Sequence, residues 1–271
     1  MKQLDSINQK VDEFISRLLD TTTSFLTPKR FIALDEKMGD FGVKTAPVTA
    51  LLLIILGIVA AIKSDSFMIF AGSLGVVVAF FVAHWCGRAL MPNCDRAVTN
   101  SHSLISSYGL FSASALILLI GFIGVFVFGI YSAIKLSKLE PMFVALAYAA
   151  VMWFFVWFLL NPSLLRIDED PNSTPGNDAL SLYLFSLAIN IRLHRVLFGA
   201  GLLSGNLLIA ISTIAIMKGG SSFSSNLMTT LIGVIVVFSA ALSPLFLYIT
   251  FVVSYLVIDI FRSILRTGKQ V

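Results

Sequence analysis

The sequence contains few charged residues. Only 13% of its 271 residues are Asp, Glu, Lys or Arg, and 57% are hydrophobic. A soluble domain carries about 25% charged residues, and the mean hydropathy of this chain is +0.92. This fraction of charged residues is too small to cover the surface of a soluble protein. We therefore expect an integral membrane protein, with the lipid bilayer as a partner.

Cysteine and histidine are also scarce. Cys86 and Cys94 are the two cysteines, and His84 and His102 lie beside them in the sequence. Two thiols do not make a disulfide framework. Two thiols and two imidazoles suit tetrahedral zinc, but short-loop zinc motifs place their cysteines about two to four residues apart. We therefore predict neither a metal nor a cofactor, and keep these four residues as candidate ligands.

Long apolar runs dominate what remains. A helix needs about 20 apolar residues to cross the hydrocarbon core. Six runs meet or approach this length: 48–62, 67–85, 109–134, 142–160, 196–217 and 227–258. The last run is longer than one span requires and contains Pro244 near its middle. It is either one kinked helix or a hairpin that turns at Ser243 and Pro244, and we favour one helix.

The distribution of positive charge predicts the orientation. With the N-terminus in the cytoplasm, all 19 Lys and Arg residues face the cytoplasm except Lys63, Lys135, Lys138 and Lys218. Cytoplasmic loops of membrane proteins carry such an excess. Both termini are therefore expected in the cytoplasm, and the compact loops suit a bacterial inner membrane. The basic residues are dispersed along helix ends, so nucleic acid is not an expected partner.

Polar segments flank the spans. Residues 1–46 predict a cytoplasmic amphipathic segment, with one helix broken near Thr21–Thr23 and a second that begins at Thr27 and Pro28 and ends near Gly39. Residues 47–160 hold spans one to four. Residues 161–195 form a cytoplasmic acidic loop, mobile over 168–178, and an interfacial helix over 179–191. Residues 196–271 hold spans five and six with a short basic tail.

Small residues recur at helical spacing in two spans. The second span carries one every four residues, and the fifth carries two glycines four apart: Ala71, Gly75, Ala79, Ala83, Gly87, Gly201 and Gly205. Such a face lets another helix backbone approach closely in lipid. The partner is either a helix of the same bundle or another subunit.

Polar residues at mid-depth form a second pattern. Asn206 is central in the fifth span, and Ser239, Ser243 and Pro244 are central in the sixth. Pro244 frees the carbonyl of Ala240, which could accept a hydrogen bond from Asn206. Polar groups beside a broken helix are typical of transport sites, although they also serve as packing contacts.

Catalytic signatures are missing from this sequence. It has no Ser-His-Asp arrangement, no Gly-rich phosphate loop and no paired intramembrane carboxylates. His84 and Asp259 are the ionisable residues of the spans, and both lie near cytoplasmic ends. Ion-driven carriers usually need an embedded ionisable group. We therefore expect neither an enzyme nor an ion-driven transporter.

These observations predict an all-α integral membrane protein with six transmembrane helices, cytoplasmic termini, and interfacial amphipathic helices at the N-terminus and before span five. The leading functional hypothesis is a non-catalytic subunit or scaffold of a larger membrane assembly, with other membrane subunits or further copies of itself as partners. The alternative is a channel or facilitator for a neutral or apolar solute that passes Asn206, Ser239 and Ser243. A third is a metal- or haem-binding redox protein.

Overall fold

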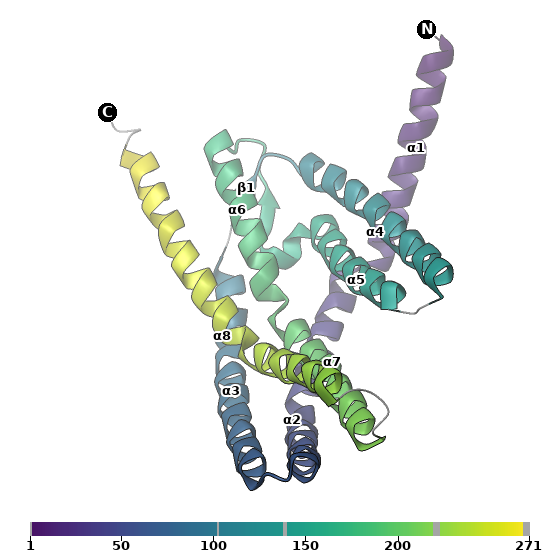
Figure 1. Ribbon diagram of the computed structural model, residues 1–271. Coiled ribbons are helices and arrows are strands. Elements are labelled where there is room, and N and C mark those ends of the chain that lie inside the picture. The colour runs from purple at the N-terminus through teal and green to yellow at the C-terminus, as the bar shows by residue number, and fades with distance from the viewer. Residues whose placement is uncertain (1, 102, 138–139, 219–222, 268–271) are drawn as a thin grey trace. The chain divides into compact units, whose positions relative to one another are not determined.

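The computed structural model describes residues 2–101, 103–137, 140–218 and 223–267. Helices dominate this part of the chain (Figure 1). They are α1 Lys2–Phe25, α2 Pro28–Ser64, α3 Phe67–Asn100, α4 Gly109–Leu136, α5 Glu140–Leu160, α6 Pro175–Arg192, α7 His194–Lys218 and α8 Phe223–Thr267. Six of them, α2, α3, α4, α5, α7 and α8, contain segments long and apolar enough to cross a membrane. The prediction of an all-α multi-pass membrane protein is confirmed.

Helix α1 continues through the three threonines that were predicted to break it. The hydroxyl of each threonine donates to the carbonyl four residues earlier, at 2.7 to 2.8 Å. These bonds satisfy the polar side chains inside the helix, so the helix does not need to end there. It ends instead at Phe25.

Helix α2 begins where predicted but does not end near Gly39. The Thr27 hydroxyl accepts a hydrogen bond from the Arg30 backbone N–H at 3.4 Å, and Pro28 takes the first helical position. The helix then runs without a break through Gly39 and Gly42 into the first span. Side chains of α7 cover these two glycines. This packing compensates for the low helix propensity of glycine, which costs about 1 kcal/mol.

Helix α8 is one continuous helix, so the hairpin alternative is excluded. Pro244 lies inside it and cannot donate to the carbonyl of Ala240. The hydroxyl of Ser243 donates to that carbonyl at 2.8 Å. The broken backbone bond is thus replaced within the same helix.

The chain divides into two compact units. Unit 1 comprises residues 1–31 and 101–189, and unit 2 comprises residues 32–100 and 190–271. Each unit is therefore built from two separate stretches of sequence. The segments predicted from the sequence, 1–46, 47–160, 161–195 and 196–271, separate cytoplasmic from membrane-spanning parts. That division describes position in the membrane rather than compactness, and it stays a prediction.

Unit 1 is centred on the α4–α5 pair. Asn161, at the end of α5, anchors the end of α1, because its amide donates to the carbonyls of Leu26 at 2.7 Å and Trp157 at 3.0 Å. Phe31 is fully buried against the rings of Trp157 and Phe158. The amphipathic N-terminal segment is thus tied to a span by both polar and aromatic contacts.

A short parallel strand pair in unit 1 was not predicted. Strand β1 Ser103–Ile105 pairs with β2 Ile167–Glu169, with Ser103 opposite Ile167. The sequence predicted a mobile acidic loop over 168–178, which overlaps β2, and it predicted no strand at β1. Three-residue strands are too short to show a periodic pattern. Beside them, Asp178 of α6 accepts hydrogen bonds from the Ser106 backbone N–H at 2.9 Å and the Ser106 hydroxyl at 2.5 Å.

Asp178 makes this contact sensitive to acid. The hydrogen bond from the Ser106 hydroxyl is the main cause that lowers the pKa of Asp178 below its ordinary value, because it stabilises the charged carboxylate. The contact therefore stabilises the fold above pH about 4, and this contribution is lost as the pH falls through the lowered pKa. The variant Ser106→Ala should raise the pKa of Asp178 in a carbon NMR titration of labelled aspartate carboxyls.

Ser107→Ala is the matched control for this titration. The Ser107 hydroxyl accepts a hydrogen bond from the Gly109 backbone N–H at 3.1 Å, and among the described contacts Asp178 accepts no bond from it. Its loss should leave the pKa of Asp178 unchanged. An equal pKa of Asp178 in the wild type and in Ser106→Ala would contradict the role given to this bond.

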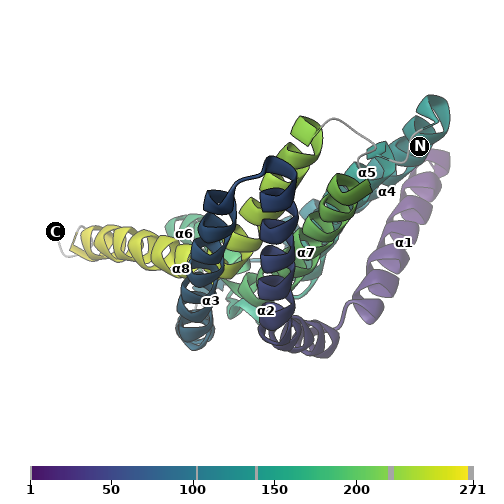
Figure 2. The ribbon, with the colours of Figure 1, turned by 60° about the horizontal axis from the view of Figure 1, so that its bottom comes forward.

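Unit 2 contains α2, α3, α7 and α8. Helices α2 and α3 lie side by side and are joined by a short turn at Asp65, and α8 packs along α7 (Figure 2). Fully buried side chains from all four helices make the core, among them Phe80, Phe198, Leu202 and Val237. Glycines at the crossings let the backbones approach closely.

Candidate functional site

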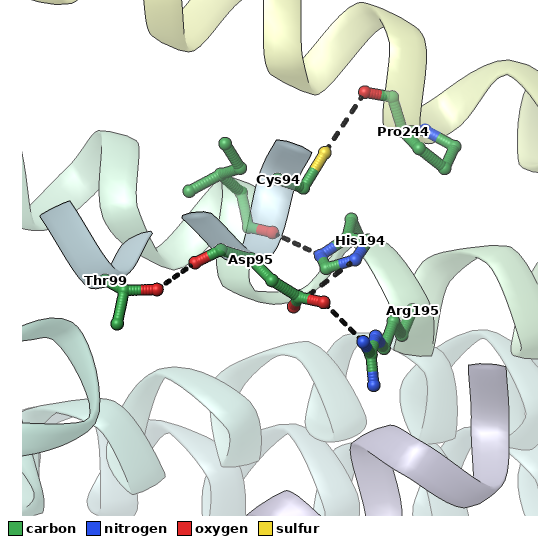
Figure 3. Close-up of polar contacts among 7 residues, drawn as sticks. Cys94, Asp95, Thr99, His194, Arg195 and Pro244 are labelled. Carbon is green, nitrogen blue, oxygen red and sulfur yellow. Dashed lines mark hydrogen bonds and ion pairs between the residues drawn. The ribbon is translucent and has the colours of Figure 1, made fainter. Parts of the chain in front are cut away.

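A charged cluster of unit 2 lies where α3 ends and α7 begins. Asp95 belongs to the last turns of α3, and His194 and Arg195 open α7 (Figure 3). One carboxylate oxygen of Asp95 accepts a hydrogen bond from the Arg195 guanidinium, and the other lies 3.9 Å from Nε2 of His194. The cluster joins residues that are about a hundred positions apart in the sequence, so it locks α3 to α7.

The hydrogen bonds of His194 determine its tautomer. The side chain is completely buried, and Nδ1 lies 2.7 Å from the carbonyl oxygen of Ile191. A carbonyl oxygen can only accept, so Nδ1 carries a proton. In the neutral ring, Nε2 is therefore an acceptor that faces the Asp95 carboxylate. This explains why Nε2 has no hydrogen-bond partner among the described residues.

Asp35 of α2 brings a second carboxylate to the cluster. It is 2% exposed, and it interacts electrostatically with Arg192 and Arg195. Its Oδ1 atom has no hydrogen-bond partner in the part of the chain that the structure describes. The stem of Arg195 also covers Gly39, since a Cβ atom on that glycine would lie 3.3 Å from Cδ of Arg195. Arg195 therefore connects α2, α3 and α7.

The cluster positions no nucleophile. The neighbouring thiol of Cys94 is buried and donates to the carbonyl of Pro244 in α8 at 3.4 Å (Figure 3). The hydroxyl of Thr99 donates to the backbone carbonyl of Asp95 at 2.5 Å. Both groups thus make packing hydrogen bonds to backbone carbonyls. The arrangement fixes four helix segments to one another.

The candidate metal ligands make separate contacts. His84 is buried between the rings of Phe80 and Phe198, and its Nε2 lies 3.4 Å from the carbonyl oxygen of Gly42. Cys94 has the bond to Pro244 just described, and Cys86 is a half-buried free thiol. His102 lies outside the described residues. Within them, no three His, Cys, Asp or Glu side chains gather in an arrangement that could hold a metal ion.

The small-residue stripe of α3 is divided along its length. Ala83 and Gly87 are buried, and a Cβ atom on Gly87 would lie 2.0 Å from the carbonyl oxygen of Ala241 in α8. Ala71, Gly75 and Ala79 are exposed. A Cβ atom on Gly75 would meet no atom within 4 Å. One part of the stripe is therefore used inside unit 2, and the other faces outward.

The glycines of α7 also lie at a helix crossing. Cβ atoms on Gly201 and Gly205 would lie 2.5 Å from side-chain atoms of Ala240 and Val237 in α8. Gly199, which flanks these two glycines in the sequence, approaches α2. A Cβ atom there would lie 2.2 Å from the carbonyl oxygen of Met38.

The polar residues predicted at mid-depth differ in their environments. Asn206 is buried, and its Oδ1 atom has no hydrogen-bond partner among the described residues. Ser239 is exposed, while Ser243 is half-buried and bonded to its own helix. Among the described residues, the Ala240 carbonyl accepts the Ser243 hydroxyl, and the suggested bond from Asn206 is not found.

Sequence reasoning missed the charged cluster. The second span was predicted to end at Trp85, which left Asp95 in a loop, whereas α3 continues to Asn100. His194 and Arg195 were assigned to the end of an interfacial helix, whereas they open α7. The sequence does show a histidine, His194, beside two arginines close to a span. This pattern does not indicate which residue pairs with them.

No protein-family model matches this sequence, and comparisons with curated proteins and with solved structures give no significant match.

Proposed function

We propose that this protein is a non-catalytic subunit or scaffold of a larger, or homo-oligomeric, membrane assembly. It is an integral multi-pass membrane protein. The distribution of Lys and Arg favours both termini in the cytoplasm, and the compact loops suit a bacterial inner membrane. The observation that carries the proposal is the outward half of the small-residue stripe on α3.

Exposed glycine has a cost that a partner helix would explain. Glycine in a helix is less stable than alanine by about 1 kcal/mol. Gly75 has no neighbour within 4 Å that excludes a side chain. It belongs to the same run of small residues, spaced four apart, as Gly87, which admits the backbone of α8. A helix from another chain that approached Ala71, Gly75 and Ala79 would use the small residues as α8 uses Gly87.

The buried charges also suit a structural role. Asp95 is paired with Arg195, and the cluster connects helix ends rather than presenting a reactive group. The polar residues of the channel alternative support it less well, because Asn206 is buried while Ser239 faces outward. The site therefore favours a scaffold over a solute pathway.

The test compares two outward-facing glycines by native mass spectrometry after mild extraction from the source membrane. In Gly75→Leu, the added side chain should block close approach, and co-purifying polypeptides or further copies of the chain should be lost. Gly124→Leu in α4 is the control: a Cβ atom at Gly124 also meets nothing within 4 Å, but Gly124 has Ile120 and Phe128 four residues away and so belongs to no small-residue stripe. This variant should keep the partners of the wild type.

Two results would refute the proposal. One is a wild-type protein that is extracted as a monomer without other polypeptides. The other is a Gly75→Leu variant that keeps every partner. Matched thermal unfolding of the two variants shows that any loss of partners is not caused by misfolding.

A further inference from the structure

An open groove lies between α3 and α8 within unit 2. Its volume is about 320 Å³. Each helix contributes residues spaced three, four and seven positions apart, which is one face of a helix. The lining residues are Asn93, Arg96, Ala97 and Asn100 from α3, and Tyr248, Phe251, Val252 and Tyr255 from α8.

The groove begins where the close contact of the two helices ends. Gly87 touches the backbone of Ala241, and the Cys94 thiol bonds the carbonyl of Pro244. Beyond these contacts both helices carry larger polar side chains. Phe251 is buried at the base, and its ring stacks on Tyr255 with centroids 5.7 Å apart. This stacking limits the positions that the Tyr255 phenol can take.

The polar lining is positive and rich in hydrogen-bond donors. Arg96 is the charged residue of the groove, and no carboxylate lines it. Within the described ranges, Arg96 forms no ion pair. The two asparagine amides and the two tyrosine hydroxyls can each donate a hydrogen bond. The groove therefore offers one unpaired cation surrounded by neutral donors.

A neighbouring groove of unit 2 has a different balance of charge. It has a volume of about 440 Å³ and lies between α2, α3 and the start of α7. Lys44, Arg88 and Arg195 line it together with Glu36 and Asp40. Arg195 is paired with Asp95, and the other acidic and basic groups offset one another. The lack of a lining carboxylate is thus a property of the groove around Arg96 and not of this whole end of α3.

We propose that the groove around Arg96 binds the phosphate group of a phosphate ester. The guanidinium would make paired hydrogen bonds to two phosphate oxygens, and the amides and phenols would donate to the remaining ones. Val252 and Ala97 give the groove an apolar wall beside the charge. A headgroup that carries acyl chains matches this combination, so an anionic phospholipid is the first source to test.

The expected orientation agrees with a lipid source. The charge distribution places the ends of α3 and α8 at the cytoplasmic leaflet, where anionic lipids attract basic residues. The site does not depend on the proposed subunit role, since every lining residue belongs to one chain. It would bind equally well in a monomer.

The experiment measures lipid binding to the full purified chain by native mass spectrometry, with phosphatidylglycerol as the probe and phosphatidylcholine as the zwitterionic comparison. Arg96→Gln should weaken phosphatidylglycerol binding about tenfold. Arg88→Gln removes the same charge from the same helix but from the other groove, and should change binding less than about twofold. Tyr255→Phe keeps the ring stacked on Phe251 and should weaken binding about threefold.

A competition arm distinguishes the source of the phosphate. If glycerol phosphate or inorganic phosphate binds the wild type and this binding depends on Arg96, while phosphatidylglycerol does not bind, the site holds with a soluble phosphate as its ligand. Equal losses in Arg96→Gln and Arg88→Gln would overturn the site, because they would indicate diffuse attraction. Unchanged binding of every probe in Arg96→Gln, or binding of none by the wild type, would also overturn it. If Arg96→Gln does not fold, the comparison of phosphatidylglycerol binding by Tyr255→Phe and by Arg88→Gln tests the site. A loss in Tyr255→Phe that is no larger than in Arg88→Gln would then overturn it.

Discussion

Replacing Gly87 with alanine should lower the free energy of unfolding by about 2 to 4 kcal/mol. The added Cβ atom would lie 2.0 Å from the carbonyl oxygen of Ala241 and 3.2 Å from its carbon. Both are backbone atoms, so no side-chain rotation can make room. Helices α3 and α8 must move apart, which also weakens the Cys94 bond to Pro244. Thermal unfolding in detergent and titration with a denaturing detergent measure the loss.

Gly75→Ala is the matched control in the small-residue stripe of the same helix. Its new methyl group meets nothing within 4 Å, and alanine favours a helix by up to about 1 kcal/mol over glycine. The isolated chain should therefore be unchanged or slightly more stable. If Gly87→Ala were as stable as Gly75→Ala, the close crossing of α3 and α8 would be wrong.

The second large effect is expected from Asp95→Asn. The change removes the charge that pairs with Arg195 and faces the buried ring of His194. Breaking a buried ion pair from one side costs about 3 to 5 kcal/mol. Because the side chains of Asp95 and Arg195 remain 30% and 27% exposed, we expect about 2 to 3 kcal/mol, near the lower end. Unfolding measurements on the full chain test this value.

A double-mutant cycle separates the ion pair from other effects. Asp95→Asn, Arg195→Gln and the double variant should show a coupling energy of at least about 1 kcal/mol. Glu13→Gln provides the exposed comparison, because Glu13 pairs with Arg17 at 3.7 Å while both side chains are largely exposed. That change should cost less than about 0.5 kcal/mol. A coupling energy near zero for Asp95 and Arg195 would show that they do not hold α3 to α7.

The spans could be predicted from the sequence because each is a long apolar run, but several helix ends could not. Helix α3 extends from the predicted end at Trp85 to Asn100. This extension contains Pro92 and Asp95, which indicate a loop when they are considered locally. Its helical form is supported by packing on α8, for example by the bond from Cys94 to Pro244. Hydropathy measures the affinity of a segment for lipid, and it does not report such contacts.

The candidate site was predictable only in part. The stripe that includes Gly75 and Gly87 follows from spacing alone. Which part of the stripe is buried and which is exposed depends on where Ala241 of α8 lies. No periodic pattern in the sequence gives that position. The pairing of Asp95 with Arg195 joins two helices that are distant in the sequence. The Arg96 groove was missed for the same reason, since Tyr248 and Tyr255 come from a helix that looks uniformly apolar.

The interleaved order of the two units has a consequence for biosynthesis. Residues 32–100 leave the ribosome before residues 190–271, with which they form unit 2. While residues 101–189 are being translated, the glycine faces of α2 and α3 have only lipid or an insertion chaperone to contact. Gly42 is not covered until Phe198 has been translated, and Gly87 is not covered until Ala241 has been translated. A nascent chain released before α8 would carry these unfilled faces into the bilayer, so quality control of this protein should act late, on chains that lack their last helix.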